Sequence, residues 1–221
     1  MDSTKLFRNT DQYTLYPDPD KVLSTEFEID SLLPLGILSL DIGREKHDVL
    51  IAVPFADDEG MIGKGDLGER CGGTWLTYLN QNGKWALGCS PEDLLSFHIN
   101  RSLVKESFYE RKKIFERCGY LPNYARDKAP AQLFEYGGDR PTTGENWFGR
   151  VRDYIPNRLE DLPGQENHRK KHFTLVGNDG NDYVMLGTVK PGVYTTVLSY
   201  TIVHFFYNPS AKTVLLIHDF Y

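Results

Sequence analysis

The sequence has few cysteines, and none of them forms a metal-binding or disulfide motif. Cys71, Cys89 and Cys118 are an odd set of three, far apart in a chain of 221 residues, with no Cys-x-x-Cys. Three thiols at such spacing neither staple a small fold nor build a zinc site by themselves. We therefore expect a reducing compartment, which makes the cytoplasm the natural location.

Long hydrophobic runs are also missing. The opening stretch, MDSTKLFRNTDQ, has no apolar segment behind a basic start, which a secretory signal would have. The longest apolar stretches, such as Tyr200 to Tyr207, are far shorter than the roughly 20 residues that a helix needs to span a bilayer. We expect no membrane partner.

Basic residues are fewer than acidic ones: 25 lysines and arginines and 31 acids give a net charge of −6. Such a chain is repelled by nucleic acid and suits a basic partner. Six acids between Asp11 and Asp30 are opposed only by Lys21. They are Asp11, Asp18, Asp20, Glu26, Glu28 and Asp30. Two interpretations stay open: a solvated loop and strand edge, or an acidic patch that steers a cationic partner.

Strand-like apolar runs occur in both halves of the chain. In the first half they cover residues 35–40, 49–55, 74–79 and 84–87, and the last two are predicted to form a hairpin. A stretch with six glycines from Gly60 to Gly73 predicts an exposed, mobile loop. In the second half the runs are 173–176, 182–186 and 194–207, and a closing hairpin joins residues 201–207 to residues 213–221. Runs so continuously apolar suit central strands that are covered on both faces.

Two helices are predicted in the middle of the chain. Ser90-Pro91-Glu92-Asp93 combines a capping side chain, a proline for the first helical position and two acids for the positive end of the helix dipole. A helix should run from there to about Asn100, and a second from near Leu103 to Gly119, where the apolar residues have helical spacing.

The order of these elements predicts an α+β fold, mainly antiparallel sheet with the two central helices packed on it. Residues 121–163 are rich in Pro, Gly and Asn, show little periodicity and are predicted to form a long irregular segment. We expect a single domain, 1–221, open to sub-division into a strand and helix half, 1–120, and a strand-rich half, 121–221.

Metal chemistry has one candidate in the sequence. If the stretch from Glu166 to His172 is helical, His168 and His172 lie one turn apart and could share a metal ion with Glu166 nearby. A zinc hydrolase also needs a Glu directly after the first histidine, but Arg169 stands there and two lysines follow. A solvated basic turn is the favoured interpretation, so we predict no metal and no cofactor.

Other catalytic patterns are incomplete. Cys71 follows Arg70, which favours a thiolate, but no base stands nearby in the sequence. His204 and His218 lie within apolar runs and are interpreted as structural histidines rather than a catalytic pair. Gly60 to Gly65 resembles a phosphate-binding loop, but Gly65 follows Lys64 where the Walker pattern needs Ser or Thr. We therefore predict that the chain is not an enzyme.

The second half of the chain resembles a known family. The segment FEYGGDRP, Phe134 to Pro141, followed by Asn146 and Trp147, resembles the "GG-x-P … W" segment of YwqG-like bacterial proteins. The stretches YERKKIFERCGYL, HFTLVGNDGNDY and IVHFFYNPSAKTVLLIHDFY are similar to other segments of that family. Gly177 stands where the family has a glutamine.

Such proteins recur as immunity partners of bacterial toxins, including nuclease effectors of type VI secretion systems. The resemblance implies a cytoplasmic inhibitor that binds one toxin and covers its basic active-site cleft. We expect the contacts to come from acids and from aromatic or basic residues of the second half. They are Asp18, Asp20, Glu26, Asp57, Asp58, Glu59, Tyr136, Arg140 and Trp147.

Two alternatives to this function stay open. The first is a metal-binding enzyme that uses His168 and His172. The second is a structural subunit of an assembly, such as a phage or secretion machine.

Overall fold

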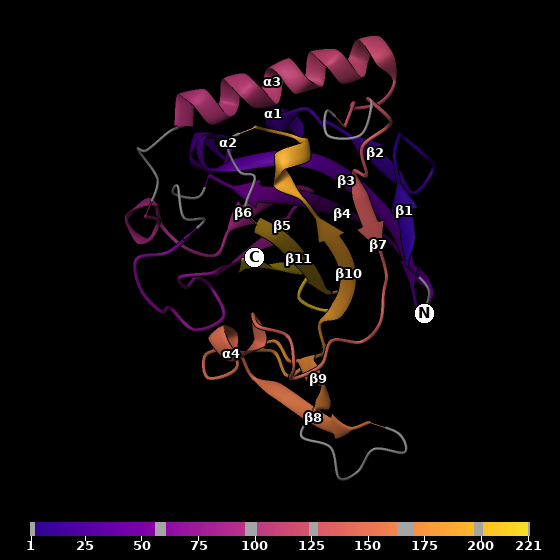
Figure 1. Ribbon diagram of the computed structural model, residues 1–221. Coiled ribbons are helices and arrows are strands. Elements are labelled where there is room, and N and C mark those ends of the chain that lie inside the picture. Colours follow the sequence, from indigo (N-terminus) through magenta and orange to yellow (C-terminus); the bar gives the residue numbers. More distant parts are fainter. Residues whose placement is uncertain are drawn as a thin grey trace.

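The computed structural model describes residues 3–55, 61–95, 101–123, 128–162, 170–196 and 201–220, which form an α+β protein with antiparallel sheets (Figure 1). The largest sheet contains β1 (Thr4–Leu6), β5 (Trp75–Gln81), β6 (Lys84–Leu87), β7 (Phe134–Tyr136), β10 (Val184–Val189), β11 (Thr201–Asn208) and β12 (Thr213–Phe220). Its strand order is β1-β7-β10-β11-β12-β5-β6, with every neighbouring pair antiparallel. Both halves of the chain therefore contribute strands to one sheet.

A second, three-stranded sheet covers one face of the first. It has the order β2-β3-β4 and comprises β2 (Tyr13–Leu15), β3 (Leu32–Ile42) and β4 (Glu45–Pro54). Between the sheets lies the main core, in which Leu38 and Val49 meet Phe205 and Leu216. The hydroxyl of Tyr78 links the sheets directly: it donates to the Leu50 carbonyl oxygen (2.7 Å) and accepts from the Ala52 N–H (3.2 Å).

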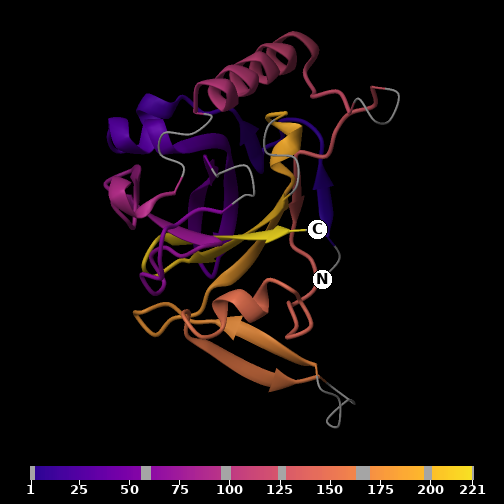
Figure 2. The same ribbon diagram turned by 60° about the vertical axis from the view of Figure 1, so that its left-hand side comes forward.

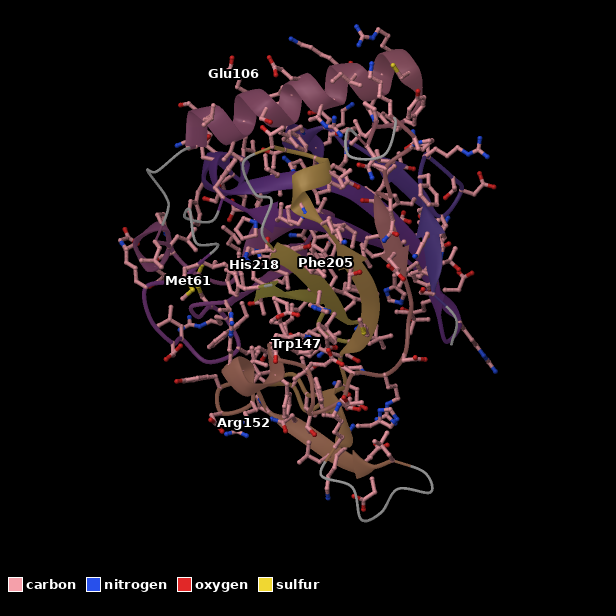
Figure 3. The ribbon with its side chains drawn as sticks, viewed as in Figure 1. Met61, Glu106, Trp147, Arg152, Phe205 and His218 are labelled. Atoms are coloured by element: carbon pink, nitrogen blue, oxygen red, sulfur yellow. The ribbon has the colours of Figure 1, made fainter. Side chains whose placement is uncertain are left out.

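The opposite face of the large sheet is covered by α4 (Phe148–Val151), β8 (Asn157–Asp161) and β9 (Lys171–Leu175). We call this the lower layer, from its place in Figures 1 and 2. It encloses a second core, in which Leu215 and Ile217 of β12 meet Trp147 and Phe173. Figure 3 shows Trp147 on this lower side of the sheet and Phe205, from the main core, above it.

The continuous apolar character of β12 follows from this arrangement. Val214 and Leu216 face the main core, whereas Leu215 and Ile217 face the second core, so that all four side chains are fully buried. Alternate residues of a strand point to opposite faces, and two covered faces need apolar residues at every position. The prediction of a central strand covered on both sides is confirmed here.

The predicted second helix is α3 (Arg101–Cys118), which lies across the top of the molecule in Figures 1 and 2. Val104, Phe108 and Phe115 form its buried face. Gly119 follows with a φ of +74°, the left-handed conformation that ends many helices. No described helix of the chain is both long and apolar enough to cross a membrane.

The predicted first helix is reduced to a single 3-10 turn, η1 (Pro91–Asp93). The capping interaction exists, because the Ser90 N–H donates to the Asp93 carboxylate (2.8 Å). The chain then leaves the helical path, because Leu94 pairs with Gly63 and the Leu95 N–H donates to the Ile62 carbonyl (2.8 Å). Backbone pairing with a distant segment overrides the local signal. Residues 96–100 lie outside the described residues.

Other departures from the predicted fold concern short helices. The acidic stretch contains two, α1 (Pro19–Val22) and α2 (Glu26–Ser31), so that the described residues hold four α-helices rather than the predicted two. The segment 121–163 is mostly irregular, as predicted, but it also contributes β7, α4 and β8. The strand predicted over 194–207 corresponds to β11 (Thr201–Asn208), whereas Tyr194 is the C-cap of a 3-10 turn, η2 (Pro191–Val193). Residues 197–200 lie outside the described residues.

Glu28 fixes α2 to the large sheet, and its removal should destabilise the fold. Its buried carboxylate accepts from the N–H groups of Thr25 (3.0 Å) and Leu87 (3.2 Å). Glu28→Ala leaves the N–H of buried Leu87 without an acceptor, so we expect a loss of about 2 to 3 kcal/mol in unfolding free energy. Urea denaturation measures this loss. Glu26→Ala, an exposed change on the same helix, should cost less than about 0.5 kcal/mol; equal losses would contradict the prediction.

Candidate functional site

Three of the predicted contact residues lie together on α1 and α2. Asp18 is the N-cap of α1, where its side chain accepts from the Asp20 N–H (3.2 Å), and Asp20 lies in the first turn. Glu26 lies in the first turn of α2, and all three side chains are exposed. Acids are favoured at these positions because the N-terminal end of a helix carries partial positive charge. We call Asp18, Asp20 and Glu26 the acidic corner.

The acidic corner is held on a fixed frame. Helices of four and six residues are too short to be stable alone. They are fixed by the segment between them: Leu23 pairs with Trp85 of β6, and the Ser24 N–H donates to the Trp85 carbonyl (3.0 Å). With the buried carboxylate of Glu28 bonded to β6 as well, the frame presents the corner without local folding on binding.

The other three acids of the stretch divide differently. Glu28 is buried and serves the frame, whereas Asp30 pairs with Lys105 of α3 (2.7 Å) and with Arg101. Asp11 is exposed, but it precedes β2 and lies outside both helices. Lys21 is 3.5 Å from Asp18, and the Lys84 ammonium donates to the Asp20 carbonyl (2.9 Å). The exposed negative charge is therefore smaller than the sequence suggests.

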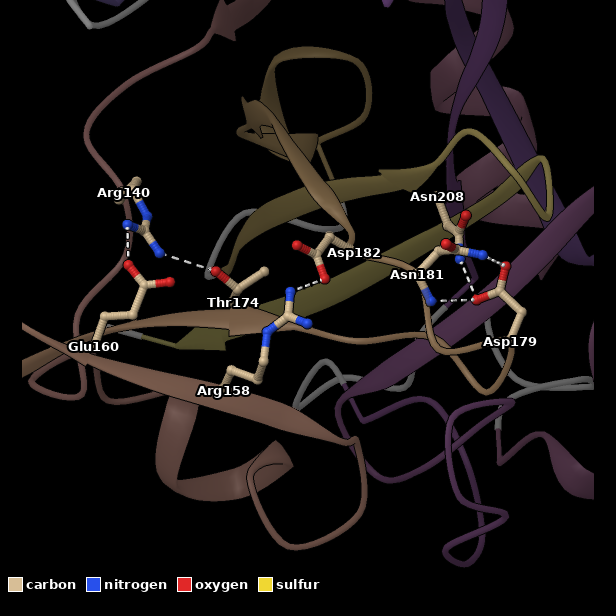
Figure 4. A network of polar contacts seen from close by, with 8 residues as sticks. All are labelled: Arg140, Arg158, Glu160, Thr174, Asp179, Asn181, Asp182 and Asn208. Atoms are coloured by element: carbon tan, nitrogen blue, oxygen red, sulfur yellow. Dashed lines mark hydrogen bonds and ion pairs between the residues drawn. The ribbon is translucent and has the colours of Figure 1, made fainter.

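The second group of predicted contact residues lies elsewhere. Tyr136 is half-buried in β7 against the main core. Arg140 lies at the lower layer, where it donates to Glu160 (2.7 Å) and to the Thr174 hydroxyl (3.0 Å), as Figure 4 shows. Trp147 is only 1% exposed and packs in the second core, edge-on to Phe173 and tilted against His204. Trp147 is thus a core residue, with no surface to offer a partner.

These two groups of residues are not brought together. Figures 1 and 2 both place α1 and α2 near α3 and place α4 and β8 at the opposite end of the molecule. Asp57, Asp58 and Glu59 lie outside the described residues. Among the predicted contacts that the structure describes, only the three residues of the acidic corner share one surface.

The helix that would pair the two candidate metal ligands is not formed at His172. His172 lies in β9, so its side chain does not follow helical spacing, and Glu166 and His168 lie outside the described residues. Among the residues that are described, no three or more His, Cys, Asp and Glu side chains group as metal ligands would.

The two candidate histidines of the last hairpin point to opposite faces of the sheet. His204 pairs with Ile217 and packs against Trp147 in the second core, with ring centroids 5.0 Å apart. His218 pairs with Val203, on the face of the main core, and is 1% exposed. Cross-strand partners share a face, so these two rings cannot act on one substrate.

Cys71 is fully buried, out of reach of a substrate. Its thiol forms a hydrogen bond with the thiol of Cys89, which lowers the pKa of Cys71 and raises that of Cys89. This contact could not be predicted from local sequence patterns, because the two cysteines are separated in the chain and meet beside β5.

A cleft with a volume of about 750 Å³ lies in the lower layer, between α4 and β8. Its polar walls carry charges of both signs, Glu145 and Asp153 against Arg152 and Lys171, and Leu159 adds an apolar surface. Because charges of both signs line the cleft, it favours neither an anionic nor a cationic ligand. It was missed in the sequence because residues 121–163 show no periodicity.

A polar network fixes the turn between β9 and β10. Buried Glu69 accepts from the Asn178 N–H (2.8 Å) and from the Tyr183 hydroxyl. Asp179 accepts from Asn181 (2.9 Å) and from Asn208 (2.8 Å), as Figure 4 shows. A Cβ on Gly177 would lie 2.6 Å from the Asn208 amide and 2.8 Å from the Asp179 carboxylate, so the turn has no room for a side chain there.

Comparison with known proteins adds no identification: no family model, no curated protein and no solved structure matches the chain.

The network makes one prediction about pH. Hydrogen bonds, chiefly from the Asn181 side chain, lower the pKa of Asp179 below its ordinary value of 3.8. A carboxyl group whose pKa is lowered by folding stabilises the folded state at pH values above its ordinary pKa. This stabilisation is lost as the pH falls through the lowered pKa. Asn181→Ala should move the pKa of Asp179 upward in a carbon-13 carboxyl titration. Asn178→Ala, in the same turn, should leave it unchanged; a shift in both variants or in neither would contradict this assignment.

Proposed function

We propose that this chain is an immunity-type inhibitor, which binds a cognate bacterial toxin and covers its active site. The observation that supports this function best is the acidic corner, where three exposed carboxylates lie on two short helices fixed by buried contacts. On this proposal the chain acts by binding and performs no catalysis of its own.

The fixed frame of the corner favours binding. A protein surface that is already ordered loses less conformational entropy when a partner docks, and more of the contact energy remains as affinity. Folding orders α1 and α2 through Glu28 and the Leu23–Trp85 pairing, which do not involve the three exposed acids. Asp20 and Glu26 remain available for a partner, as does Asp18 in part, because Asp18 also caps α1 and lies 3.5 Å from the exposed Lys21.

The charge of the corner points to a cationic partner. A toxin that cuts nucleic acid has a basic cleft for the phosphate backbone, and exposed carboxylates both steer its approach and compete for that cleft. The net charge of −6 over the whole chain acts in the same direction. The resemblance to YwqG-like proteins, which include partners of type VI secretion effectors, agrees with this class of target.

The test of function is neutralisation of a toxin encoded beside this chain. Co-expression of the chain with that toxin domain should restore growth, and the purified proteins should form a one-to-one complex by size-exclusion chromatography with light scattering. A toxin that stays active at excess inhibitor, with no complex formed, would overturn the proposal.

The contribution of the corner can be tested separately by association kinetics. D18N/D20N/E26Q should slow association with the toxin several-fold at low salt, and the difference should shrink as salt screens the charges. The matched control is E106Q/E110Q/E116Q, which removes three exposed acids from α3 (Glu106 is labelled in Figure 3). The control has the same net charge as the test variant. Equal slowing in both would assign steering to total charge and remove the corner as the contact site.

A further inference from the structure

Strand β8 uses only one of its two edges. It pairs with β9 alone, in a two-stranded sheet. In Figures 1 and 2, β8 lies at the bottom of the molecule, on the far side of β9 from the large sheet. Its second edge therefore points away from the rest of the protein.

The direction of the backbone groups on β8 follows from the ladder. The Val176 N–H donates to the Pro156 carbonyl (2.8 Å), so Arg158 and Glu160, at steps of two, are the residues that bond to β9. The N–H and C=O groups of the alternate residues, Asn157, Leu159 and Asp161, point to the outer edge. Within the described residues these groups have no backbone partner.

The other sheet edges of the described chain are short or partly occupied by hydrogen bonds. The edge of β6 is bonded to the α1–α2 segment, and the Tyr78 hydroxyl bonds to β4 at Leu50 and Ala52. β1 and β2 have only three residues each. The outer edge of β8 is five residues long and carries Leu159, whose exposed fraction is 52%.

We propose that β8 pairs antiparallel with β8 of a second copy of this chain, about a two-fold axis at Leu159. The two lower layers then join in a four-stranded sheet, β9-β8-β8-β9. The outward N–H and C=O groups of Leu159 bond to those of Leu159 in the second copy, and those of Asn157 bond to Asp161. The exposed leucines lie side by side on one face of this sheet.

The side chains select this register. On the other face, Arg158 stands opposite Glu160 of the second copy, and the same contact occurs twice because of the symmetry. A shift of two residues, the smallest that keeps the outward groups paired, would set Arg158 against Arg158 or Glu160 against Glu160. Opposite charges across a strand pair stabilise it and like charges destabilise it. The order Arg-Leu-Glu is thus self-complementary in one register only.

Existing ion pairs extend this arrangement. Within one chain, Glu160 pairs with Arg140 (2.7 Å) and Arg158 pairs with Asp182, as Figure 4 shows. Pairing of two copies places these pairs end to end, as Arg140, Glu160, then Arg158 and Asp182 of the second copy. Charges of alternating sign follow one another across the interface, twice in the dimer.

Charged residues also protect sheet edges from unwanted pairing, which is the rival explanation of this surface. Protection works through charges that remain unmatched when a second edge approaches. Here the charges match in the two-fold register, and the central residue is an exposed leucine. The short interface predicts a weak dimer that forms at high protein concentration.

Charge reversal tests the pairing. R158E or E160R alone should weaken the dimer roughly tenfold or more in sedimentation equilibrium, because each sets like charges opposite each other. An equimolar mixture of the two variants should associate again, since every cross-strand pair is then of opposite charge. R152E, an equally exposed arginine reversal outside β8, should leave the dimer intact.

A cross-link tests the register. Residues that form a hydrogen-bonded antiparallel pair have Cα atoms about 5.5 Å apart, within reach of a disulfide. L159C, in a C118S background that removes the exposed native thiol, should form a covalent dimer when oxidised glutathione accepts the two electrons and two protons of the thiols. N157C and D161C each stand opposite a different residue of the second copy and should cross-link more slowly.

Each outcome of these experiments either supports or overturns the pairing of β8. A wild-type chain that stays monomeric at about 1 mM would overturn the proposal and leave the edge to charge protection or to a strand of another protein. Circular dichroism spectra of R158E and E160R that match the wild-type spectrum show that the variants are folded, so that a loss of association cannot come from misfolding. Folded variants that associate as the wild type does, or that fail to associate when mixed, would equally overturn it. None of these results depends on toxin binding, because the acidic corner lies at the other end of the molecule.

Discussion

The structure depends on the burial of β11 and β12 on both faces. Their apolar side chains alternate between the two cores, and one covering layer would leave half of them in water. The three-stranded sheet and α3 enclose the main core, whereas Trp147, Phe148 and Phe173 close the other side. The lower layer is thus required by the fold, and its outermost strand, β8, lies at the protein surface for that reason.

Much of this architecture could be predicted from sequence, and the failures have identifiable causes. Central strands, the hairpin of β5 and β6, and the helix ending at Gly119 follow from apolar periodicity and turn chemistry. The helix predicted at Ser90 does not form because Leu94 pairs with Gly63 and Leu95 bonds to Ile62, 31 and 33 residues earlier, and local propensity does not report such pairing. The burial of Trp147 was missed for a similar reason: its neighbours Phe173 and His204 come from distant strands.

Sequence is equally limited in predicting which charged residues of the candidate site are exposed. The sequence predicts a cluster of acids, but only the fold decides which of them face solvent. Glu28 caps α2 and bonds to β6, and Asp30 pairs with α3, so neither is available to a partner. Asp18 and Glu26 are also placed by helix capping and dipole effects. Local stability therefore explains the position of these acids, whereas their exposure on a fixed frame is what favours a binding role.

The acidic corner and the outer edge of β8 can both be used in one assembly. The acidic corner lies near α3, and the outer edge of β8 lies at the opposite end, as both ribbon views show. Two copies joined through β8 would therefore keep both corners exposed, pointing away from the shared sheet. A two-fold pair of edges uses up the outer edge of each β8, so this contact closes on itself and does not grow into a ring or filament. Self-association through β8 thus agrees with an inhibitor that binds one toxin per chain better than with a subunit of an extended assembly.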